Sequence, residues 1–146
     1  YQPVAGDLRR VMTIFKVNGE IERAGDLAVA IARHVAAVAA RPPAIPWSFA
    51  EIGTRAREQF AAALRTLREH DATGAHAVIE ADDAIDALYR AGAARAAACI
   101  REDPAGANAY LAALSVFRAL ERVGDVATNI AEDVIYLETA ELVRHG

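Results

Sequence analysis

Apolar side chains recur at helical spacing along most of the chain, and the pattern is clearest in its last third. One stripe there consists of Val116, Val123, Val126, Ile130, Val134 and Leu137. Four of these residues are spaced seven apart, which is nearly two turns of an α-helix, so their side chains share one face. The pattern predicts a long amphipathic helix that turns this stripe toward a core.

A second stripe lies roughly opposite the first one on the same predicted helix. It starts apolar and becomes acidic halfway, through Tyr110, Leu114, Phe117, Glu121, Asp125, Thr128 and Glu132. A helix with apolar side chains on two sides is usually packed between neighbours. We therefore expect this helix to lie inside a bundle, with its carboxylates along the edge of a groove.

The helical pattern is interrupted most strongly by the prolines at 42, 43 and 46, because proline cannot sit inside a helix. Asp7 is a candidate cap for the helix before this break, and Ser48 with Glu51 has capping-box spacing after it. Turn signals also stand at 71–74 and at 103–104. The sequence predicts an all-α protein with helices over 7–40, 48–70, 74–101 and 105–142. The third is expected antiparallel to the second and fourth, and the first alongside them or in a partner chain.

An internal repeat links the two ends of the chain. Residues 22–32 recur as residues 121–131, at an offset of 99 and with seven of eleven positions identical, including the string Glu-Arg-x-Gly-Asp in both. Two helices are predicted upstream of the second copy but none upstream of the first. The repeat therefore indicates a lone third helix of an incomplete unit over 1–40, a proline-rich linker over 41–47, and a complete three-helix unit over 48–146.

Composition supports this fold and narrows the function. Alanine supplies 36 of the 146 residues, and it is a strong helix former that is depleted in strands. The net charge of −4 gives no global basic field, so we expect no nucleic-acid partner. No apolar run is long enough to span a membrane. The single cysteine, Cys99, suits a reducing compartment, and a start at Tyr1 without a leader suggests a trimmed piece of a soluble protein.

Carboxylates four residues apart form the candidate chemistry. Three such pairs share a helix face each: Glu121 with Asp125, Asp82 with Asp86, and Glu22 with Asp26. Like charges at this spacing destabilise a helix by about 0.2–0.5 kcal/mol. Clusters of carboxylates suit hard or borderline cations such as magnesium, manganese or iron. The pairs Glu121/Asp125 and Asp82/Asp86 are predicted to face each other and form one metal site.

A plainer interpretation is an acidic surface balanced by arginines. Arg118 precedes Glu121 by three residues and Arg90 follows Asp86 by four, so such ion pairs are available. The four histidines are scattered, and none forms the Glu-x-x-His string of di-iron bundles. No zinc-type cysteine and histidine spacing and no nucleotide-binding loop occurs. Spacing alone leaves both interpretations open.

The chain resembles the PhoU family of bacterial phosphate-signalling regulators. The resemblance rests on Gln2–Arg9, on the two Glu-Arg-x-Gly-Asp strings, on Glu80–Asp86, on Asn129–Glu132 and on Tyr136–His145. Family members are similar in having two tandem three-helix bundles with the motif helix third in each. This chain lacks the first two helices of that arrangement, and Ala30 stands where the second repeat has Asn129.

The resemblance implies a cytoplasmic adaptor that is not an enzyme and that represses a phosphate-starvation response. Its implied partners are the ATPase subunit of a phosphate ABC transporter and a sensor histidine kinase, with dimers and bound iron, manganese, magnesium or zinc as family traits. The metal ligands expected are Glu121, Asp125, Asp82 and Asp86, with Glu22 and Asp26 as a second site. A carboxylate-bridged metal-binding bundle or metalloenzyme and a purely structural helical module are the alternatives.

Overall fold

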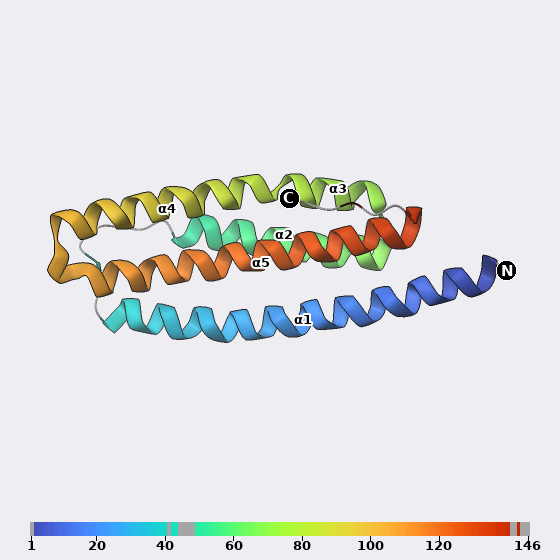
Figure 1. The fold of residues 1–146 in the computed structure, drawn as a ribbon, viewed down its shortest axis with the longest axis horizontal. Helices are drawn as coiled ribbons and strands as arrows, with labels where there is room; N and C mark the ends of the chain where they lie inside the picture. The colour runs from blue at the N-terminus through green and yellow to red at the C-terminus, as the bar shows by residue number, and fades with distance from the viewer. Residues whose placement is uncertain (1, 41, 44–48, 141–142, 144–146) are drawn as a thin grey trace.

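The computed structural model of the chain describes residues 2–40, 42–43, 49–140 and 143. Its elements are α1 (Gln2–Ala40), α2 (Phe49–Glu69), α3 (Ala72–Glu80), α4 (Asp82–Glu102), the short 3₁₀ helix η1 (Pro104–Gly106) and α5 (Ala107–Thr139). No strand occurs within these ranges. The predicted all-α class is confirmed, and Figure 1 shows the elements as an elongated helical bundle.

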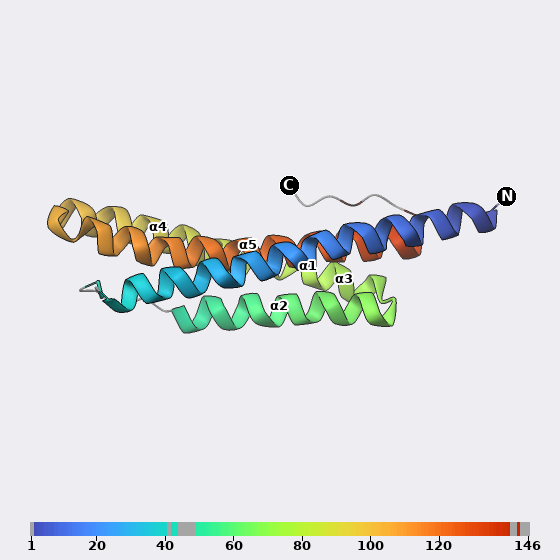
Figure 2. The same cartoon turned by 90° about the horizontal axis from the view of Figure 1, so that it is seen from below.

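The helices are organised around α5. Figures 1 and 2 show α1 running antiparallel along α5, and the α3–α4 rod running antiparallel to both α2 and α5. Helices α2, α3 and α4 all pack on α5, whereas α1 approaches the backbone of α5 alone among the described helices. The predicted arrangement of the last three helices is therefore confirmed, with the first helix alongside them in the same chain.

Several helix ends differ from the sequence prediction. The first helix is described from Gln2 and so includes Asp7, the predicted cap. The predicted cap Ser48 lies outside the described residues, and α2 is described from Phe49. The last helix is described to Thr139, followed by Ala140 in the left-handed conformation with a φ of 61°.

The predicted third helix is two helices that meet at Ala81. It starts at Ala72, two residues before the predicted start, and Asp71 caps it with a carboxylate that accepts a hydrogen bond from the Gly74 amide at 2.9 Å. Asp103 caps the next start in the same way, since its carboxylate accepts from the Gly106 amide at 3.2 Å. Aspartate fits both positions because its short side chain reaches the free amides of a first helical turn.

The core follows the first apolar stripe of α5. Val116, Val126, Ile130 and Val134 are buried, with exposures of 2% or less. The second stripe is also covered: Phe117 stacks against Phe49 of α2 with ring centroids 5.5 Å apart, and its ring lies against Gly92 of α4. The prediction of a helix packed between neighbours is confirmed.

One side of helix α1 packs on α5, and most of the rest of the helix is exposed to solvent. Val17 and Leu27 are buried against α5, and the Lys16 ammonium forms an ion pair with Asp133 at 3.0 Å. Large apolar side chains are exposed along this helix, namely Leu8, Val11, Met12, Ile14, Phe15, Ile21, Val29 and Val35. None of the described helices is long and apolar enough to cross a membrane.

Candidate functional site

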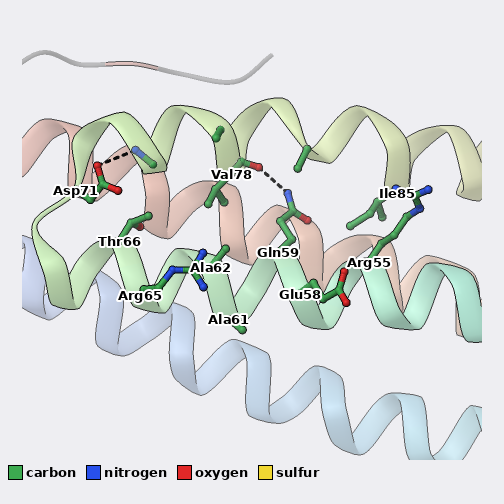
Figure 3. A pocket seen from close by; sticks show the side chains of 13 residues that line it. Arg55, Glu58, Gln59, Ala61, Ala62, Arg65, Thr66, Asp71, Val78 and Ile85 are labelled. Carbon is green, nitrogen blue, oxygen red and sulfur yellow. Dashed lines mark hydrogen bonds between the residues drawn. The ribbon is translucent and has the colours of Figure 1, made fainter.

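A buried polar junction joins α2, α4 and α5 beside the second motif. Gln59 and Asp82 are 4% and 3% exposed, and the Gln59 amide donates to the Asp82 carboxylate at 3.1 Å. The same amide donates to the Val78 carbonyl at 3.1 Å, as Figure 3 shows. This carbonyl lies one turn before Asp82, where α3 gives way to α4, so Gln59 ties α2 to the break between them.

Gly124 of the second Glu-Arg-x-Gly-Asp string forms the third wall of this junction. A Cβ atom at this position would lie 2.6 Å from Oδ1 of Asp82 and 3.0 Å from Oε1 of Gln59. The first distance is shorter than carbon–oxygen contacts allow and the second is tighter than most, so any side chain here would displace Asp82 or Gln59. Close approach of the neighbouring helix thus explains why a poor helix former stands in the middle of α5.

Glu121 lies one turn before Gly124, at the edge of the junction. Burial raises the pKa of Glu121, and the Asp125, Asp86 and Asp82 carboxylates raise it further, in that order, while Arg118 lowers it. The four predicted carboxylates therefore lie near enough to one another for their charges to interact. The negative potential they create favours any bound cation.

The four carboxylates are not equivalent. Asp82 is buried, whereas Glu121, Asp125 and Asp86 are half-buried. Asp86 forms an exposed ion pair with Arg90 at 3.5 Å, so part of the arginine-balanced interpretation is present in the structure. Exposed pairs of this kind contribute little, about 0–1 kcal/mol, and leave the carboxylate available to other ligands.

The second candidate pair has a different environment. Glu22 and Asp26 are both exposed on α1, and Gly25 between them has no atom within 4 Å of the place where a Cβ would lie. The structure thus brings Glu121 and Asp125 near Asp82 and Asp86, but brings no described helix over Glu22 and Asp26. The two copies of the motif occupy unlike sites.

A metal at the first cluster would find oxygen ligands. Within the described ranges, no three aspartate, glutamate, histidine or cysteine side chains lie at the spacing of a metal centre. Oε1 of Gln59, however, is a buried oxygen with no hydrogen-bond partner, and it lies over Gly124 beside Asp82. Carboxylates with a neutral carbonyl oxygen are the donor set of hard cations, which often keep several waters. Metal binding at this cluster therefore stays a prediction.

Two polar contacts between α1 and α5 escaped the sequence prediction, the ion pair of Lys16 with Asp133 and a hydrogen bond between Asn129 and Glu20. The Asn129 amide donates to the Glu20 carboxylate at 3.2 Å, which explains the departure at this position of the repeat. Position 20 corresponds to Ala119 at the offset of 99, just as Asn129 corresponds to Ala30. The polar pair Glu20 and Asn129 thus corresponds, in the repeat, to the two alanines Ala119 and Ala30.

Gln59 also escaped the sequence prediction, although a signal for it existed. It interrupts an otherwise small and apolar stripe of α2 formed by Ile52, Ala56, Ala63 and Thr66, all of them buried. A long amide in such a stripe needs buried partners. Gln59 also lines a groove of about 540 Å³ between α2 and the α3–α4 rod, with Arg55 and Arg65 on the α2 side (Figure 3).

Comparison with known proteins finds one family. The model of the PhoU domain matches residues 1–35 and 49–134. The chain is 35% identical over 147 aligned residues to a phosphate-specific transport system accessory protein PhoU homolog from Pseudomonas putida, covering 99% of this chain and 57% of that protein. The corresponding homolog from Aquifex aeolicus is also 35% identical, with 99% and 66% covered.

Solved structures agree with the sequence matches. The crystal structure of PhoU from Pseudomonas aeruginosa superposes with a TM-score of 0.89 at 31% identity, over 97% of this chain and 68% of that one. The phosphate transport system regulatory protein PhoU from Streptococcus pneumoniae gives a TM-score of 0.85 at 26% identity, over 96% and 67%. The chain spans somewhat more than half the length of the Pseudomonas putida relative. On the family-model match, the relatives and the shared fold together, the chain belongs to the PhoU family.

Proposed function

We propose that this protein is a regulatory accessory component of phosphate-specific transport and not an enzyme. The observation that carries this proposal is the match, over 99% of the chain, to relatives named as accessory proteins of that transport system. The relatives are longer, so the proposal concerns the part of their activity that resides in one motif helix and one complete three-helix unit.

The mechanism we propose is adaptor contact on the cytoplasmic side. The protein bridges the ATPase subunit of a phosphate ABC transporter and a sensor histidine kinase, and it thereby represses the phosphate-starvation response. An action through contact is supported by the names of the relatives, which are accessory proteins of a transport system and not the transporter itself. A second copy of the chain is one such partner, which makes a dimer part of the proposal.

The carboxylate cluster is proposed as a metal site that serves this role. Its proposed ligands are Glu121, Asp125, Asp82 and Asp86, and its ion is magnesium, manganese, iron or zinc. Burial raises the pKa of Glu121 and the neighbouring carboxylates raise it further, and a bound cation would relieve the repulsion among these carboxylates. The exposed Glu22 and Asp26 remain a second, more open candidate. In a metal-binding bundle of another function, the same site would act without the two protein partners.

A pulldown between this protein and the ATPase subunit tests the adaptor proposal directly. Retention of the subunit that depends on the exposed α1 face is the expected result, and substitution of Val11 and Phe15 by serine should abolish it. Serine at Leu111, an exposed residue on α5, is the matched control. Absence of any interaction with both the ATPase subunit and the kinase would end the adaptor proposal.

The metal proposal has its own experiment. Metal-stripped protein is melted with added manganese, iron(II), zinc or magnesium, and the same series is run on a Glu121→Ala, Asp125→Ala double variant. An ion that binds the folded form raises its melting temperature by mass action. We expect stabilisation of the parent only. Equal stabilisation of both proteins, or of neither, would reduce the cluster to an acidic surface.

A further inference from the structure

We draw no further inference here: the strongest candidate, the groove between α2 and the α3–α4 rod, carries nothing because Glu58 and Asp71 line it together with Arg55 and Arg65 and nothing in the structure shows what covers it.

Discussion

Helices α1 and α5 carry the same Glu-Arg-x-Gly-Asp string in unlike surroundings. On α5, Tyr110 and Thr128 are each 4% exposed beneath the other helices. Their counterparts at the offset of 99, Val11 and Val29, are 62% and 50% exposed. Both helices use matching faces to pack on each other, but among the described helices only α5 has neighbours over its second face. The string thus specifies which faces a helix can offer, and the neighbours decide whether a face becomes a core and a site.

Replacing the two matched isoleucines by alanine should give the largest difference in stability between the two helices. Ile130 is fully buried, so Ile130→Ala should lower the free energy of unfolding by about 2–5 kcal/mol. Its counterpart Ile31 is half-buried, so Ile31→Ala should cost clearly less. Urea unfolding monitored by circular dichroism measures both values. Similar losses would mean that α1 is as deeply packed as α5.

Alanine at the two motif glycines should have opposite effects. Gly25→Ala meets nothing and should stabilise α1 by about 0.8–1 kcal/mol through helix propensity. Gly124→Ala sets a methyl group against Asp82 and Gln59, and overpacking of this kind costs about 1–3 kcal/mol. Thermal melts of both variants give the signs. A gain at both positions would show that the junction opens to admit a methyl group.

The hydrogen bond between Asn129 of α5 and Glu20 of α1 should contribute less to the free energy of unfolding. Asn129→Ala gives the second repeat the residue of the first and removes the hydrogen bond to Glu20, so we expect a loss of about 0.5–1.5 kcal/mol. A double-mutant cycle with Glu20→Ala isolates the coupling, and Ala30→Asn serves as the control because Ala119 offers it no carboxylate. Additive effects of the two substitutions would show that this hydrogen bond does not stabilise the packing of α1 on α5.

The smallest effect should come from the charge of the motif glutamates. The raised pKa of Glu121 means that the folded form holds its proton to higher pH than the unfolded chain, so stability falls as the pH rises between the two values. Glu121→Gln should therefore stabilise at pH 7 by more than about 0.2–0.5 kcal/mol, the cost of the one like-charge pair that Glu22→Gln also removes. The gain should vanish in acid, below the ordinary pKa of glutamate.

Glu22→Gln is the control for this pH dependence, since Glu22 is exposed on α1. Unfolding by urea at a series of pH values, in metal-free buffer, compares the two variants with the parent. A gain of equal size at both positions would assign the effect to the helix itself and not to the neighbouring Asp82 and Asp86. A gain that grows toward acid would contradict the direction of the pKa shift.

Periodicity was sufficient for most of the fold. The alternation of apolar and polar positions predicted four helical stretches, the antiparallel order of the last three and the two covered faces of α5, because burial at helical spacing leaves a direct trace in sequence. Helix ends were less certain. The split at Ala81 leaves no trace, since alanine favours a continuous helix and the Val78 carbonyl next to it is bonded by Gln59 of another helix.

The candidate site was predicted in part for the same reason. Spacing along one helix pairs Glu121 with Asp125, and antiparallel packing brings Asp82 and Asp86 near them. Gln59 comes from a third helix, and no pattern within α2 states which carboxylate its amide meets. Likewise, Lys16 and Asp133 are far apart in sequence, and only the register of α1 on α5 joins them. Contacts between helices depend on that register, which local periodicity leaves undetermined.

Among the described helices, α1 approaches the backbone of α5 alone, and this attachment has a consequence for assembly. Its docking on α5 is equivalent to the binding of a tethered ligand, and the chain between Ala40 and Phe49 supplies an effective concentration that is roughly millimolar for a short tether. Every contact that α1 makes with its own α5 can be made with the α5 of another copy. Concentrated protein can therefore exchange first helices reciprocally and form a swapped dimer without any new interface.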